Sequence, residues 1–192
     1  MKHLIIFTLI VLVSISCARK TVTRVNPDQQ IDLSGRWNDT DSKLVAEEMT
    51  KDVLNRPWRE EFFKRTGKKP TMILGMISNK SHEHIEAETF IKNLEREFIN
   101  TATVRVVQNA EFREKMRTER ADQQQFAAPE TQKKWGKELG ADYMLFGNIN
   151  SIVDTEGKRK VIYYQINLEL ADLETNELVW LGEKKIKKYV VN

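Results

Sequence analysis

The most constraining feature of the sequence is a stretch near the C-terminus, Val161–Leu170, in which apolar and polar side chains alternate without interruption. Successive side chains of a β-strand point to opposite faces of the sheet, so this alternation predicts a strand with one buried and one solvent-facing side. The buried side would carry Ile162, Tyr164, Ile166, Leu168 and Leu170, and the other side Tyr163, Gln165, Asn167 and Glu169.

Two turns place this strand inside a three-strand meander. The turn at Thr155–Lys158 follows a strand predicted at Asp142–Val153. The turn at Asp172–Glu177 precedes a last strand at Leu178–Tyr189. Strands joined by such short turns pair antiparallel. The lysines near the end of the last strand are typical of a sheet edge, where they discourage pairing with another chain.

Upstream of the meander, helical periodicity alternates with short apolar runs. The runs at Thr71–Ile77 and Val104–Val107 predict two more strands. This order predicts an α+β domain, a mixed β-sheet with helices packed on it that ends in the C-terminal antiparallel three-strand meander. Helices are predicted to begin after Asn38, at Pro57, at Ala87, after Asn109 and at Pro129.

Apolar spacing also predicts which side of a helix is buried. For the helix at Pro57, which would end at Gly67, the expected inward residues are Trp58, Phe62 and Phe63. For the helix at Pro129, they are Trp135 and Leu139, with Gly140 as its stop.

The N-terminus predicts the compartment. A basic start, the apolar run Leu4–Ile15 and a small residue before Cys17 are typical of a secretory signal peptide, and the run is shorter than the ~20 residues that span a bilayer. Val13–Cys17 resembles the lipobox of bacterial lipoproteins, with Ser14 where leucine is usual. We expect a signal peptide at 1–16, a lipidated Cys17 with a flexible tether at 17–30, and a single domain at 31–192. A plain secreted protein or a short anchor is the alternative.

Composition and missing motifs narrow the function. The 31 Lys and Arg residues against 28 Asp and Glu give a net charge of +3, too small to indicate nucleic-acid binding. The single cysteine excludes an internal disulfide. Neither a phosphate-binding glycine loop nor a G-x-S-x-G nucleophile motif occurs. We therefore expect no cofactor.

One cluster, Ser81–Glu88, follows a predicted strand and precedes a helix, where functional loops are common. His82 and His84 could bind one metal ion with Glu86 as a third ligand. The alternative is a polar loop whose acidic residues are favoured by the helix dipole.

Four stretches resemble the penicillin-binding-protein activator LpoB family of lipoproteins. Ile31–Asp39 looks like the family's opening segment, and Leu139–Gly147 looks like its helix-to-strand turn. Asn79–Ile91 looks like its loop-to-helix junction, and Leu168–Lys188 looks like its final hairpin. The resemblance covers about residues 31 to 188.

The resemblance implies a domain like the amino-terminal part of TolB, in an outer-membrane lipoprotein facing the periplasm. It also implies that the protein binds and stimulates a bifunctional peptidoglycan synthase and is not an enzyme. The tether departs from the family's long Pro-rich linker: residues 18–30 span at most ~45 Å when extended. A different envelope partner, a structural or secretion accessory role, and a metal-dependent enzyme using His82 and His84 stay open as alternatives.

The partner is expected to dock on the solvent-facing side of the last two strands. Interfaces favour aromatic anchors ringed by polar groups. If these strands pair as a hairpin, Tyr163 and Gln165 lie beside Lys185 and Lys187. A solvated face is the alternative, and one bulge would reverse the side-chain parity. The loop at Asn79–Glu88 is the next candidate.

Overall fold

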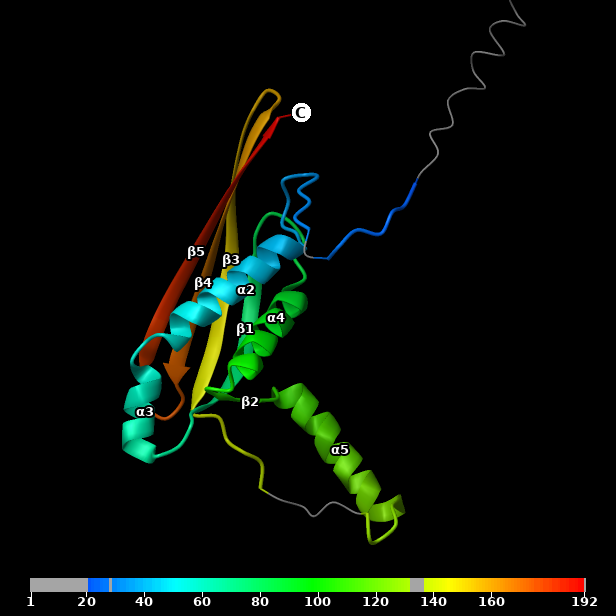
Figure 1. The fold of residues 1–192 in the computed structure, drawn as a ribbon, viewed down its shortest axis with the longest axis vertical. Coiled ribbons are helices and arrows are strands. Elements are labelled where there is room, and N and C mark those ends of the chain that lie inside the picture. Colours follow the sequence, from blue (N-terminus) through cyan, green and yellow to red (C-terminus); the bar gives the residue numbers. More distant parts are fainter. Residues whose placement is uncertain (1–20, 28, 132–136, 192) are drawn as a thin grey trace, which may run out of the picture. The chain divides into compact units, whose positions relative to one another are not determined.

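The computed structural model describes residues 21–27, 29–131 and 137–191 (Figure 1). Internal contacts divide the chain between Gln30 and Ile31, and the fold below is that of the second unit. The predicted signal peptide, Cys17 and Trp135 lie outside the described residues. No helix in the described ranges combines the length and the apolar character that a membrane span requires.

The described part of the second unit contains four helices and five strands, and the predicted α+β class is confirmed. The helices are α2 (Asp39–Leu54), α3 (Trp58–Thr66), α4 (Ala87–Thr101) and α5 (Ala110–Phe126). The strands are β1 (Thr71–Lys80), β2 (Arg105–Val107), β3 (Tyr143–Glu156), β4 (Arg159–Asp172) and β5 (Leu178–Val191).

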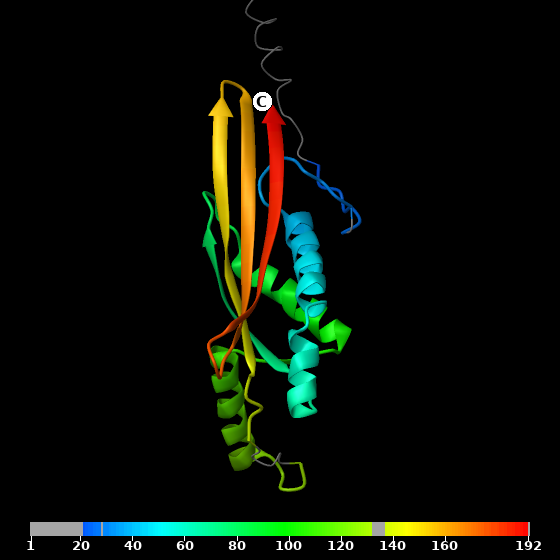
Figure 2. The same cartoon turned by 90° about the vertical axis from the view of Figure 1, so that its left-hand side faces the viewer.

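The strands form one mixed sheet in the order β2-β1-β3-β4-β5. β1 pairs in parallel with β2 and β3, and α4 connects β1 to β2. β3, β4 and β5 pair antiparallel, which confirms the predicted meander. Helices α2 and α4 pack on one face of the sheet, and neither covers the other face (Figures 1 and 2). β5 is therefore an edge strand with one open face.

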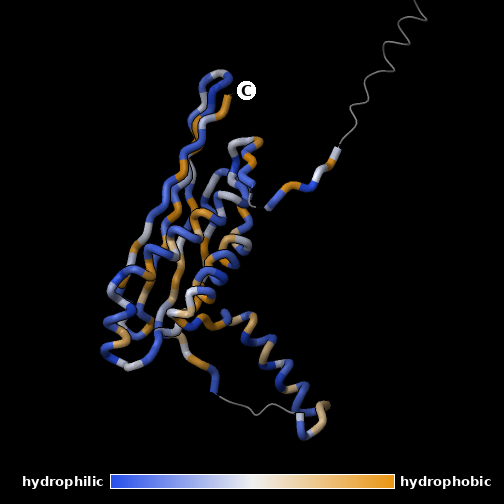
Figure 3. The backbone as a smooth tube through the Cα atoms, viewed as in Figure 1, coloured by the Kyte–Doolittle hydropathy of each residue, from blue (hydrophilic) through white to orange (hydrophobic). Residues whose placement is uncertain are grey.

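The core lies between the sheet and these two helices. Alternation along β4 places Ile162, Tyr164 and Ile166 on the helix side, all fully buried, as predicted. Helix α4 contributes Phe90 and Phe98 to the same cluster. Hydrophobic and hydrophilic residues accordingly alternate along the strands in Figure 3. Burial on one side only is what leaves the second face available for contacts.

Two glycines lie on either side of Leu168 in a row that crosses three strands of the sheet. Leu168 of β4 lies directly opposite Gly147 of β3 and Gly182 of β5. A Cβ atom on Gly147 would lie 2.1 Å from the carbonyl oxygen of Asn167, and one on Gly182 would lie 2.0 Å from the indole of Trp180. Both positions therefore require glycine, since their space is filled by neighbouring groups.

Helix ends follow the sequence signals. The Asn38 side chain accepts from the backbone N–H of Asp41, and the Asp41 side chain accepts from that of Asn38, which completes a capping box at α2. Gly67 ends α3 in the left-handed region with φ of 69°. Asn109 caps α5 through the N–H of Phe112.

Two helix predictions need correction. Phe63 is 57% exposed, because only one stripe of the short α3, with Trp58 and Phe62, faces the sheet. The helix predicted from Pro129 is wrong where it can be checked: residues 129–131 form a turn, 137–140 are irregular, and 132–136 lie outside the described residues. Leu139 is 48% exposed, so the apolar contacts that a helix would need there are not made.

Candidate functional site

The open face of the sheet brings together the four residues predicted to dock a partner. Tyr163 of β4 lies directly opposite Lys187 of β5, and Gln165 lies opposite Lys185. A bulge does occur in this strand pair, but it falls between Leu170 and Ala171, beyond these positions. The parity of the two strands is therefore as predicted, whereas the docking role stays a prediction.

A chain of side-chain hydrogen bonds runs across this face. Tyr163 Oη donates to Gln165 Oε1 at 3.3 Å, and Gln165 Nε2 donates to Asn167 Oδ1 at 3.1 Å. Asn148 Oδ1 on β3 then accepts from Asn167 Nδ2 at 3.2 Å and from Asn150 Nδ2 at 2.5 Å. We call these five residues the amide ladder. Because the side chains hold one another, the ladder presents its remaining polar groups in a fixed array.

Charged and apolar groups flank the ladder. Lys185 pairs with Glu183 at 2.5 Å, and this hydrogen bond raises the pKa of the lysine above its ordinary value. Ile152 lies opposite Tyr163 on β3 and is 66% exposed. The face thus combines an aromatic ring, an exposed aliphatic side chain, carboxamides and lysines, a mixture that suits a protein interface.

Sequence reasoning missed two of the five ladder residues. Asn148 and Asn150 lie within a strand that was predicted, but their position beside Gln165 and Asn167 depends on the β3–β4 register. The sequence signal for Asn148 and Asn150 was the occurrence of polar residues at every second position in an otherwise apolar stretch.

The histidine loop does not form the metal site considered from the sequence. His82 Nδ1 lies 2.6 Å from Ser151 Oγ on β3, whereas His84 Nε2 is 3.7 Å from Glu86 and its side chain is 90% exposed. The two histidines therefore have different partners. Within the described ranges, no three His, Cys, Asp or Glu side chains form a group that could hold a metal ion.

The same loop fastens the segment that precedes α2, residues 31–38, which we call the strap. Glu83 Oε1 accepts from the backbone N–H of Trp37 at 3.3 Å and from the hydroxyl of Tyr164. Burial and this hydrogen bond to Glu83 raise the pKa of Tyr164. The Trp37 ring packs edge-on against Tyr164 and Phe90, with centroids 5.7 Å and 6.3 Å apart. The loop is therefore a structural clamp.

A largely buried lysine holds the other end of the strap. Lys188 Nζ lies 2.7 Å from Asp32 Oδ1 and 2.6 Å from Asp41 Oδ2, and it donates to the carbonyl of Arg36 at 3.0 Å. Only 12% of its side chain is exposed. Burial lowers the pKa of Lys188, but the hydrogen bonds to the two aspartates outweigh this and leave it raised. The strap is thus tied to the last strand of the domain.

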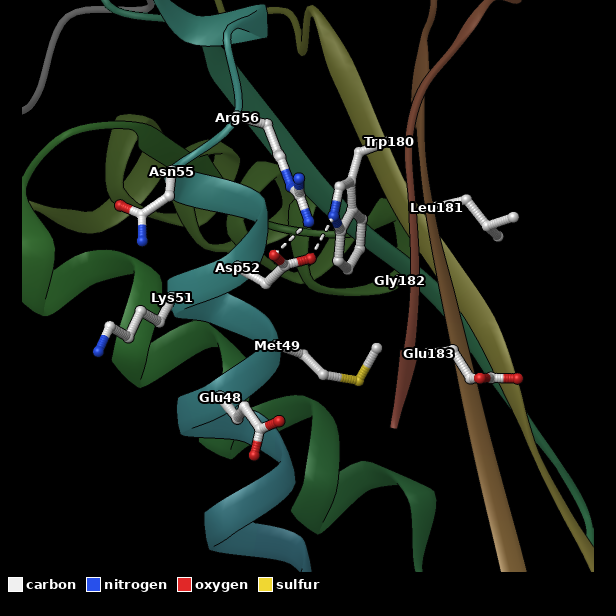
Figure 4. Close-up of a pocket in the computed structure, with 10 residues that line it drawn as sticks. All are labelled: Glu48, Met49, Lys51, Asp52, Asn55, Arg56, Trp180, Leu181, Gly182 and Glu183. Carbon is white, nitrogen blue, oxygen red and sulfur yellow. Dashed lines mark hydrogen bonds and ion pairs between the residues drawn. The ribbon is translucent and has the colours of Figure 1, made fainter. Parts of the chain in front are cut away.

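A groove of about 490 Å³ lies between α2 and β5 (Figure 4). Asp52 stands between its two partners there, accepting from Trp180 Nε1 at 2.8 Å and pairing with Arg56 at 2.6 Å. Glu48 pairs with Lys184 of β5. Because these charges are paired with one another, the groove is a seam that joins α2 to the edge strand.

The residues that carried the family resemblance also have internal partners. Asp142, in the turn before β3, accepts from the backbone N–H of Thr71 at 2.8 Å and so aligns β3 with β1. Trp180 belongs to the core cluster, and the partly buried Trp37 packs against it. The residues that carry the family resemblance therefore stabilise the fold of the domain.

The sequence matches a known protein family. A family model described as "Peptidoglycan-synthase activator LpoB" matches residues 41–186. The LpoB C-terminal domain from Escherichia coli is 16% identical, with 77% of this chain and 99% of that chain covered and a TM-score of 0.44. The NMR structure of E. coli LpoB is 12% identical, with coverages of 91% and 84% and a TM-score of 0.41.

The lipoprotein GNA1162 from Neisseria meningitidis is 13% identical, with 62% of this chain and 83% of that chain covered and a TM-score of 0.40. No curated protein sequence matches the chain. The family match spans α2 through most of β5, and so the whole sheet and its helical layer. The chain therefore belongs to the LpoB family of peptidoglycan-synthase activators.

Proposed function

We propose that this protein activates a bifunctional penicillin-binding protein by direct contact through the amide ladder and its flanking lysines. Family membership confirms the prediction of a non-enzymatic envelope activator of peptidoglycan synthesis. The particular partner, the docking face and the lipid anchor are parts of the proposal.

The observation that carries the docking face is the hydrogen-bonded ladder beside exposed apolar and basic side chains. Tyr163 supplies an aromatic anchor, and its hydroxyl is already oriented by Gln165. A fixed side chain loses less conformational entropy on binding than a free one. Lys187 is exposed at the same end of the face, where it can steer an acidic partner surface.

The docking face is tested by the double substitution Tyr163→Ala with Lys185→Glu. Hot-spot residues contribute about 2 kcal/mol or more each, so we expect affinity for the purified penicillin-binding protein to fall at least about 100-fold. Affinity is measured by surface plasmon resonance and stimulation by the rate of glycan-strand synthesis. Circular dichroism reports whether the fold is kept.

The matched control is Met116→Ala with Lys115→Glu on α5, which removes an exposed apolar side chain and reverses one charge away from the ladder. It should bind as the wild type does. Full binding by the ladder variant would move the interface to another surface and reject this docking face.

The proposed anchor is Cys17, and the proposed location is the outer membrane with the domain facing the periplasm. One myristoyl-sized chain holds a protein only marginally, whereas several acyl chains anchor it stably. We therefore expect Cys17→Ser to move the protein from the membrane pellet to the soluble periplasmic fraction. A variant that stays in the pellet would show that something other than this cysteine holds the protein.

The short tether limits where the partner can be met. Residues 18–30 reach at most ~45 Å, so the penicillin-binding protein must extend its docking region to within that distance of the anchoring membrane. Lengthening the tether with a flexible insert should leave binding in solution unchanged, since the docking face is not altered.

A further inference from the structure

A second groove, of about 520 Å³, lies where α3 meets the loop after α4. We call it the α3 groove. Phe63, Pro70 and Ala102 line it with apolar groups, and three cationic side chains stand around them, with Glu60 as the one anionic side chain of the lining. The cations are Arg59, Lys64 and Lys69.

These cations differ from those of the seam between α2 and β5, because no carboxylate pairs with them within the described ranges. Lys69 donates to the carbonyl of Ala102 at 2.7 Å, and Arg59 donates through one Nη to the carbonyl of Leu54. An ammonium carries three donors and a guanidinium five, so each keeps donors for an anion. The Nε of Arg59 is buried and has no hydrogen-bond partner in the described part of the chain.

Apolar surface accompanies this unpaired charge. Phe63 is 57% exposed although it belongs to a helix whose other aromatic residues are buried. Ile99, near the end of α4 and outside the groove lining, is 59% exposed. Exposed aromatic and aliphatic side chains beside lysines and arginines are the combination found where proteins contact the interface of an anionic bilayer.

We propose that the α3 groove binds an anionic phospholipid at a membrane surface. Lys64, Lys69 and Arg59 contact the phosphate, and Phe63 inserts beside the first part of an acyl chain. The charge of the groove, three cations against one carboxylate, selects anionic over zwitterionic headgroups. The site is separate from the amide ladder, so it acts in addition to partner binding.

The test uses the secreted chain with Cys17→Ser, so that no acyl anchor contributes, in co-sedimentation with phosphatidylglycerol-containing vesicles. Pure phosphatidylcholine vesicles are the neutral comparison. Near an anionic surface each basic side chain strengthens binding about five- to sixfold, and the double substitution removes two of them. Lys64→Glu with Lys69→Glu should therefore weaken vesicle binding at least about 30-fold. Phe63→Ser, at a position that is exposed in the free protein, should weaken vesicle binding about tenfold, because the aromatic contact with the bilayer is lost.

The matched control is Lys115→Glu with Lys158→Glu, which makes the same change in net charge at exposed sites outside the groove. Its vesicle binding should stay within about threefold of the parent, because surface charges act mainly within a Debye length. Equal loss in the control and in the groove variant would show a general charge effect and overturn the site. Absence of binding to phosphatidylglycerol vesicles, or full displacement by soluble glycerol phosphate, would overturn a lipid as the ligand.

Discussion

Replacing Lys188 by alanine should lower the free energy of unfolding by about 2 kcal/mol, because removing one member of a partly buried ionic group leaves its partners uncompensated. The ammonium lies within 2.7 Å of both Asp32 and Asp41, and the Asp41 side chain is only 11% exposed. Without Lys188, two carboxylates face each other across a partly buried space. Urea unfolding should show a lower midpoint with an unchanged slope.

The pH dependence of this effect has a defined sign. The pKa of Lys188 is raised in the folded protein, so its stabilising contribution is complete below the unfolded value of about 10.4 and is lost as the pH rises through the folded value. The difference in stability between wild type and Lys188→Ala should therefore be constant near neutrality and shrink above about pH 10.4. Lys187→Ala, at an exposed neighbour, should change stability by less than about 0.5 kcal/mol. Equal stability of the two variants would contradict the role assigned to Lys188.

Gly147→Ala is expected to cost about 3 kcal/mol or more through overpacking. The new methyl group would lie 2.1 Å from the carbonyl oxygen of Asn167 and 2.7 Å from Leu168 Cδ2. The first is backbone within the β3–β4 ladder, so it cannot move without breaking strand pairing. A thermal melt should show a fall of roughly 9 °C or more, since about 1 kcal/mol corresponds to about 3 °C for a domain of this size.

Gly140→Ala is the matched control, because no atom of the described residues lies within 4 Å of the Cβ position and its φ is not positive. This change should be neutral or slightly stabilising through the unfolded state. A Gly147→Ala protein as stable as the Gly140→Ala protein would show that the two strands separate easily at this point.

The elements that were predicted correctly are those with one dominant period. The strict alternation along β4 can bury its apolar residues in one way only, and the buried set of Ile162 to Leu170 is as expected. Phe63 was misplaced because adjacent aromatic residues on a helix point about 100° apart, and periodicity alone did not decide which one faces the sheet. The helix expected at Pro129 had only two apolar positions to support it.

Only part of the candidate site could be predicted from the sequence, for a related reason. Tyr163 and Gln165 lie on a strand whose parity is readable from its own residues, whereas Asn148 and Asn150 join them only through the register of β3 against β4. The histidine loop shows the opposite error. Its residues are adjacent in sequence, but His82 is directed to Ser151, whose position beside the loop depends on the fold.

The strap imposes an order on the assembly of the domain. Its residues leave the ribosome before any other part of the domain, yet Asp32 pairs with Lys188, which lies 156 positions later in the chain. Contacts of such large sequence separation form slowly, because a long loop must close before they gain any energy. The first segment of the domain to be synthesised therefore waits for β5, the last strand, before the contacts of Asp32 and Asp41 with Lys188 can form.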